Sequence, residues 1–182
     1  MVDSALLERL ADALPENGEL PYSDRFELRR ALAAESPEAL LRLEASCARR
    51  AIPIWTAAFP DDTLPIDVMN AALSEPDNED LESELGELKT YLDNVFDYGD
   101  DYFTANYAGS ACWAVARDAL GDVTEEPDGD GELQIPPDEW SPCFFASIAE
   151  AGGAVWEDVA DDAKRREFWR WYLLEALPAA QA

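Results

Sequence analysis

The chain has 182 residues and a formal net charge of −27, with 40 Asp and Glu residues against 13 Lys and Arg. Its hydrophobic content of 48% is sufficient for a buried core in one ordinary domain, which argues against disorder. An anionic field of this size repels nucleic acid and acidic lipid, and it speeds association with basic partners. We therefore expect neither direct nucleic-acid binding nor membrane binding.

Histidine is absent, which removes the commonest general base and the commonest metal ligand. Cys47, Cys112 and Cys143 are far apart, form no C-x-x-C pair and lie in apolar runs, so we expect reduced, buried thiols. The N-terminal "MVDSALLERL" has no basic region, and no segment approaches the roughly 18 apolar residues of a membrane span. These features favour a soluble, cytoplasmic protein.

Apolar residues recur at helical spacing along nearly the whole chain, and the alternating pattern of strands is missing. Asp3 or Ser4 can cap a first helix, and Ser36 followed by Pro37 is a strong helix start. Pro53 should kink the third helix or split it in two. The predicted helices of the first half cover residues 3–14, 23–34, 36–59 and 65–74.

The second half contains an acidic segment that opens at Asp77 and then an alanine-rich helix over 104–121, whose small side chains would let another helix approach closely. Loop residues dominate 121–140, and two more helices are predicted near 138–151 and 161–177. We therefore predict an all-α fold: a single-domain bundle over 1–182 with about seven to eight helices and an acidic loop near 121–137.

The stretch "YLDNVFDYGDDYFTANY" (91–107) has the pattern of one amphipathic helix. At 100° per residue one arc is apolar and predicted to be core, and the opposite arc is acidic. The i,i+4 aspartate pairs of the acidic arc would each cost roughly 0.2–0.5 kcal/mol, so this arc is either a solvated face or a surface for a cationic partner. Gly99 lies on the apolar arc and marks either a close helix contact or a helix end. The apolar arc comprises Tyr91, Leu92, Val95, Phe96, Tyr98, Tyr102 and Phe103, and the acidic arc comprises Asp93, Asp97, Asp100 and Asp101.

Two kinds of site that acidic residues can form are not supported. Glu126, Asp128, Asp130 and Gly131 align with positions 1, 3, 5 and 6 of a calcium-binding EF-hand loop, but Pro137 occupies position 12, which requires a bidentate Glu. A pair of carboxylates could support glycoside hydrolysis, but no pair stands out by an apolar, pKa-raising setting. Phosphate-binding glycine loops and metal-ligand spacings are also missing. We predict no enzymatic activity and no catalytic, cofactor-binding or metal-binding residues.

The C-terminal helix begins with Asp161 and Asp162, which suit the positive end of the helix dipole. Phe168 and Trp171 are expected to pack in the core. Because Trp169 and Trp171 are two residues apart, they point to different faces, so at least one is predicted to lie near the surface, where a tryptophan can anchor a partner.

Three segments together resemble bacterial immunity proteins of polymorphic toxin systems, specifically the all-helical fifth immunity family and its relatives. These segments are "CARRAIPIWTAAFPDDTLP" (47–65), "NYAGSACWAVARDALG" (106–121) and "RREFWRWYLLEALPAA" (165–180). The first carries most of the similarity, with Pro53, Trp55 and Phe59 followed by Pro60, Asp61, Asp62 and Pro65. The resemblance implies a protein that neutralises a cognate toxin by binding and has no catalytic residues of its own.

A nuclease target would explain the charge, because an enzyme that grips phosphates has a basic cleft that an anionic surface can occupy. The predicted contact residues are Asp93, Asp97, Tyr98, Asp100 and Asp101, with Asp61 and Asp62 as a second choice. The alternative is a DNA-mimic regulator that binds a basic nucleic-acid-binding protein. A neighbouring toxin gene would distinguish the two, and the oligomeric state is left open.

Overall fold

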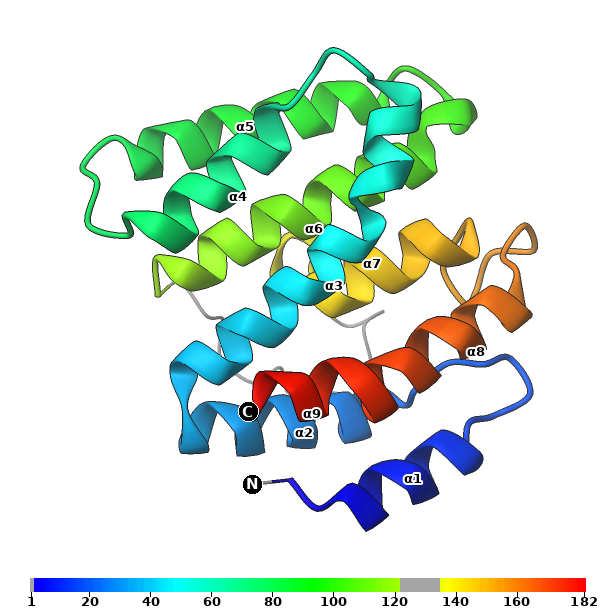
Figure 1. The fold of residues 1–182 in the computed structure, drawn as a ribbon. Helices are drawn as coiled ribbons and strands as arrows, with labels where there is room; N and C mark the ends of the chain where they lie inside the picture. The colour runs from blue at the N-terminus through cyan, green and yellow to red at the C-terminus, as the bar shows by residue number, and fades with distance from the viewer. Residues whose placement is uncertain (1, 122–134) are drawn as a thin grey trace.

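The computed structural model describes residues 2–121 and 135–182, and in these ranges the regular secondary structure consists of helices joined by turns and loops (Figure 1). Eight helices have nine or more residues, which confirms the predicted all-α bundle. They are α1 (Ser4–Asp12), α2 (Tyr22–Glu35), α3 (Pro37–Ala58), α4 (Leu64–Ser74), α5 (Leu81–Phe96), α6 (Phe103–Ala119), α7 (Pro142–Ala151) and α8 (Asp162–Trp171). Short 3-10 turns cover Asp100–Tyr102 and Pro137–Glu139, while a π-helical segment, Tyr172–Ala176, and α9 (Leu177–Ala180) continue α8.

Side-chain caps fix several helix starts. Asp3 accepts a hydrogen bond from the amide of Ala5, and Ser36 accepts one from the amide of Ala39. Both caps are among those predicted. Helix α2 begins at Tyr22, directly after Pro21 and one residue earlier than predicted.

Helix α3 continues through Pro53, so of the two predicted effects of this proline, a kink or a split into two helices, the split does not occur. Pro53 is exposed, whereas Ala51 and Trp55 on either side of it are buried in the core. The backbone group that loses its partner at a proline therefore faces water, which can satisfy it. Packing of the buried face keeps the two halves of α3 together.

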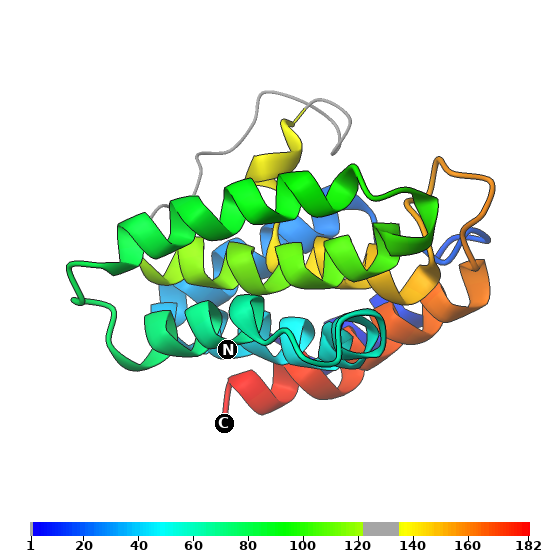
Figure 2. The same cartoon turned by 90° about the horizontal axis from the view of Figure 1, so that it is seen from above.

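Helix α6 runs through the centre of the bundle and packs against α3, α4, α5 and α7 (Figures 1 and 2). Its alanines allow these neighbours to approach closely, as predicted. Residues 105 and 106 and every residue from Ala108 to Asp118 are buried. A helix that is buried on all sides is the middle of a core rather than an amphipathic surface helix.

The C-terminal helix confirms the predicted core packing of Phe168 and the different faces of Trp169 and Trp171, but Trp171, which was predicted to pack in the core, is the more exposed of the two tryptophans. Phe168 and Trp169 are fully buried, whereas Trp171 is half-buried and carries the guanidinium of Arg50 at 4.6 Å from its ring centroid. The three cysteines are free and buried, also as predicted. Within the described ranges, no helix combines the length and the apolar character that crossing a bilayer requires.

Candidate partner-binding surface

The stretch 91–107 is not one helix, and this prediction is wrong. Helix α5 ends at Phe96, Asp97 is its C-cap, and a 3-10 turn leads into α6 at Phe103. Gly99 makes the break, because its φ of 112° is a conformation that side chains other than glycine rarely adopt. A Cβ atom added there would meet nothing within 4 Å, so of the two predicted roles Gly99 has that of a helix end.

Two of the predicted core aromatics are exposed at or next to this break. Phe96 is 45% exposed and Tyr98 is 56% exposed, whereas Leu92 and Val95 on the same predicted arc are buried. Helical periodicity no longer applies beyond Phe96, so the side chain of Tyr98 projects from a turn. Its ring meets that of Tyr102 edge to face, with centroids 6.0 Å apart.

The turn that follows α3 is fixed by Asp62. The indole Nε1 of Trp55 donates a hydrogen bond to the carbonyl oxygen of Asp62 over 2.7 Å. The carboxylate of Asp62 accepts one bond from the amide of Leu64 at 2.9 Å and another from the hydroxyl of Tyr91. Burial and the adjacent Asp62 carboxylate raise the pKa of the Tyr91 hydroxyl above its usual range, so the hydroxyl stays a donor at neutral pH.

Aromatic contacts bring this turn against the break between α5 and α6. Phe59 stacks on Tyr102 with centroids 5.3 Å apart, and Trp55 lies 4.6 Å from Phe59. The two segments adjoin at the upper right of Figure 1. We call this surface the acidic-aromatic end, and it comprises Phe59, Asp61, Asp62, Leu64, Tyr91, Asp97, Tyr98, Asp100, Asp101 and Tyr102.

Six of the seven predicted contact residues lie at the acidic-aromatic end, and Asp93 does not. Asp93 is on another side of α5, where its carboxylate accepts a bond from Lys89 at 2.6 Å. It lines a groove of about 250 Å³ together with Phe96, Trp113 and Trp140. The predicted helical repulsion between Asp97 and Asp101 does not arise, because these two residues belong to different elements, and Lys89 forms an ion pair with Asp93 of the other predicted pair.

The sequence reasoning missed Leu64 and Tyr91 as members of this surface. Tyr91 lies on the apolar arc of α5, but its hydroxyl reaches Asp62 across 29 residues of sequence. Leu64 is 41% exposed at the first position of α4, where no periodic signal distinguishes an exposed leucine from a buried one. Only the Pro60-Asp61-Asp62 turn that separates Phe59 from Leu64 indicates that aromatic and acidic groups meet here.

Three arginines are used inside the molecule and so do not offset the acidic surface. Arg25, Arg117 and Arg165 are at most 4% exposed. Arg165 donates to the carbonyl oxygens of Asn17 and Gly153, and Arg117 donates to those of Asp138 and Trp140. The excess of carboxylates is therefore concentrated at the surface, where it generates the long-range field.

The described residues give no support for a reactive cysteine or a metal site. Burial raises the pKa values of Cys47, Cys112 and Cys143, which keeps these thiols protonated and unreactive. Among residues 2–121 and 135–182, no group of three or more Cys, Asp or Glu side chains is arranged to hold a metal ion. The acidic loop predicted near 121–137, including the EF-hand-like alignment at Glu126, Asp128, Asp130 and Gly131, lies largely outside the described residues.

Comparison with known proteins identifies the chain's relatives. The family described as Immunity protein Imm5 matches residues 8–179, which is nearly the whole chain. No curated protein matches it. Membership in a family of immunity proteins implies binding to a cognate toxin, and such proteins generally act without catalysis. The resemblance seen in the three sequence segments is thereby confirmed: the chain belongs to the Imm5 family of immunity proteins.

Proposed function

We propose that the protein neutralises one cognate toxin by stoichiometric binding through its acidic-aromatic end. The observation that carries this proposal is the meeting of two acidic turns, 61–62 and 97–101, around exposed Tyr98 and Leu64. Central apolar and aromatic anchors with a charged periphery are the usual composition of a binding hot spot. Tyr98 is the proposed anchor, and Asp97, Asp100 and Asp101 provide the charge.

The target that best fits this surface is a nuclease. Enzymes that grip phosphates expose Lys and Arg around the active site, and an anionic surface can occupy that site with fast association. Asp62 has a different role from the other aspartates, since its carboxylate already accepts two hydrogen bonds within the turn. We propose that it holds the turn in shape while Asp61, which is exposed, makes contact.

We also propose that the protein acts in the cytoplasm. Three free cysteines without a disulfide among them suit a reducing compartment. A nuclease toxin would reach its substrate in the same compartment.

Two triple charge reversals test the binding surface. Asp97→Lys/Asp100→Lys/Asp101→Lys should abolish rescue of cells that express the toxin and should weaken binding by roughly a hundredfold or more, since each charged contact contributes about 1 kcal/mol or more. The matched control, Asp77→Lys/Glu79→Lys/Asp80→Lys, changes the net charge equally at the exposed turn before α5. This control should keep most of the affinity and full rescue. Equal loss in both variants would mean that overall charge, not this surface, governs binding.

A further inference from the structure

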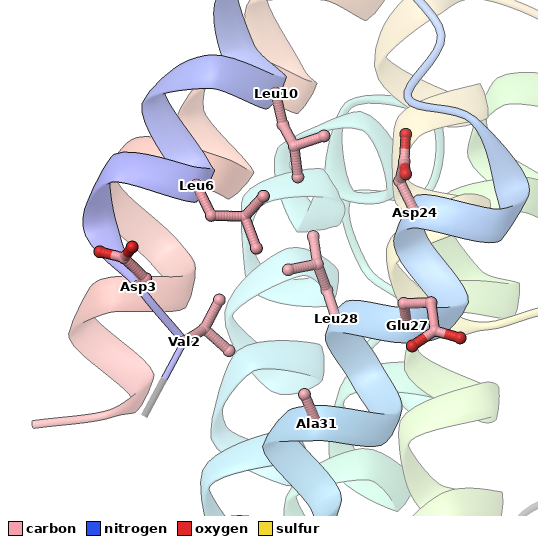
Figure 3. A pocket seen from close by; sticks show the side chains of 8 residues that line it. All are labelled: Val2, Asp3, Leu6, Leu10, Asp24, Glu27, Leu28 and Ala31. Carbon is pink, nitrogen blue, oxygen red and sulfur yellow. The ribbon is translucent and has the colours of Figure 1, made fainter.

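A second surface lies between α1 and α2, at the opposite end of the molecule from α5 (Figure 1). Helix α1 packs mainly against the π-helical segment Tyr172–Ala176, and α2 packs against α3, so the two helices leave a groove between them. Its volume is about 370 Å³. Figure 3 shows the residues that line it: Val2, Asp3, Leu6, Leu10, Asp24, Glu27, Leu28 and Ala31.

The floor of the groove is formed by two facing apolar stripes. One stripe consists of Leu6 and Leu10 on α1 and Val2 just before it, spaced four residues apart. The other consists of Leu28 and Ala31, which are three residues apart on α2 (Figure 3). Val2, Leu6 and Leu10 remain half-buried, and Ala31 is exposed. Two such stripes are the surface onto which a third helix packs its own apolar side chains in a helical bundle.

The rim of the groove is acidic. Asp3 and Asp24 lie on its two sides, and Glu27 lies one turn after Asp24 (Figure 3). Glu27 forms an ion pair with Arg30 at 3.0 Å, but both side chains are more than half exposed. An exposed pair of this kind contributes little, roughly 0–1 kcal/mol, and can be exchanged for a pair with a partner. The rim therefore favours a partner that carries positively charged side chains.

We propose that this groove binds an amphipathic α-helix of a partner protein, with leucine-like residues on one face and Lys or Arg on its flanks. The apolar floor accepts the apolar face, and the acidic rim accepts the flanking cations. A second copy of this chain is a poor occupant, because the net charge of −27 would set acidic surface against acidic surface. The site is independent of the acidic-aromatic end and does not rest on the proposed toxin contact.

Binding of a designed peptide tests the proposal without knowledge of the natural partner. The probe is a fluorescein-labelled peptide of leucine and lysine, about 14 residues or four helical turns long, with its leucines on one helical face. A peptide of the same composition in scrambled order is the control for charge alone. Fluorescence anisotropy on the full-length protein at about 0.15 M salt should show at least roughly tenfold tighter binding of the amphipathic peptide.

A pair of variants assigns the binding to the groove. Ala31→Arg places bulk and positive charge on the floor of the groove and should weaken binding roughly tenfold or more. Ala57→Arg makes the same charge change at an exposed position at the end of α3, and its affinity should stay within about threefold of wild type. Circular dichroism checks that both variants fold, and bound peptide should slow hydrogen exchange in 2–10 and 24–31. Equal binding of the two peptides, equal effects of the two variants, or self-association through the groove in place of peptide binding would each overturn the proposal.

Discussion

At the scale of single residues, Gly109 sets how closely three helices can approach. A Cβ atom at this position of α6 would lie 2.7 Å from Leu92 on α5 and 2.9 Å from Trp55 on α3. Both neighbours are buried and cannot move aside freely. The glycine therefore allows the side chain of Trp55 to reach the turn at Asp62, which it holds by its indole hydrogen bond.

Gly109→Ala should destabilise the protein despite the better helix propensity of alanine. The overpacking is expected to cost about 1–3 kcal/mol, which exceeds the propensity gain of about 1 kcal/mol. Gly86→Ala is the matched control, because Gly86 lies within α5 with nothing within 4 Å of an added Cβ. This control should gain roughly 0.5–1 kcal/mol. Urea denaturation measures both, and a stabilised Gly109→Ala protein would contradict the close approach.

Glu44 is a carboxyl group buried in the core. It is 1% exposed and accepts hydrogen bonds from Nε and Nη2 of Arg29, which also pairs with Asp118 at 3.3 Å. Burial raises the pKa of Glu44 to about 7, and the nearby Asp118 carboxylate acts in the same direction. Arg29 opposes this shift but does not cancel it. The neutral form is thus favoured in the folded protein up to near-neutral pH.

The pH dependence of stability should reveal this group. The folded-state pKa of Glu44 lies above its ordinary value of 4.5, so the folded protein binds the proton more tightly than the unfolded chain. The free energy of unfolding should therefore fall as pH rises from about 4.5 to about 7, and stay level above that range as far as Glu44 is concerned. Glu44→Gln should lack this component. Denaturant titrations of both proteins at pH 5 and pH 8 measure it, and parallel pH profiles would exclude a raised pKa.

The buried arginines illustrate what could not be read from the sequence at this scale. Arg25 is 3% exposed and lies over the rings of Phe144 and Trp169, at 4.6 and 5.1 Å from their centroids. Arginine is usually a surface residue, and no local pattern distinguishes one that will stack between aromatic rings. The reduced state and burial of the cysteines were predictable because each lies in an apolar run.

At the scale of elements, the helices were predictable where the sequence carries explicit caps. They were predicted wrongly where the apolar spacing of one helix continues past the residue at which the helix ends. Ser36 and Pro37 start α3 as predicted. Tyr98 and Tyr102 fall on the apolar arc of α5 by spacing alone, but Gly99 ends the regular geometry that this spacing assumes. The contact between Phe59 and Tyr102 joins segments 43 positions apart, so it follows from tertiary packing rather than from local pattern.

Helix dipoles give Asp97 and Asp101 different effects on stability. Asp97 caps the C-terminus of α5, where a negative charge is unfavourable, whereas Asp101 precedes the N-terminus of α6, where it is favourable. Asp97→Asn should therefore raise the free energy of unfolding by about 0.3–1 kcal/mol more than Asp101→Asn does. Thermal or urea denaturation at low salt measures the difference. Equal changes in both variants would indicate general charge repulsion and no dipole effect.

At the scale of the whole molecule, the charge is separated between the interior and the surface. Arg166 and Arg170 donate to carbonyl oxygens at the end of α1 and just beyond it, including those of Leu14 and Ala11. Together with the buried arginines, they stabilise the junctions between helices, and Arg170 also pairs with the exposed Asp12 at 3.4 Å. The net charge and the resemblance to the family could be read from the sequence. The carbonyl and carboxylate partners of the arginines depend on the fold.

The most direct test of the central claim is the salt dependence of the association rate with the cognate toxin. For the wild-type protein the rate constant should fall steeply between about 0.05 and 0.5 M salt, because screening removes electrostatic steering. The Asp97→Lys/Asp100→Lys/Asp101→Lys variant should associate slowly with a nearly flat dependence, while the Asp77→Lys/Glu79→Lys/Asp80→Lys control keeps most of the wild-type slope. Identical slopes for the two variants would contradict binding through the acidic-aromatic end.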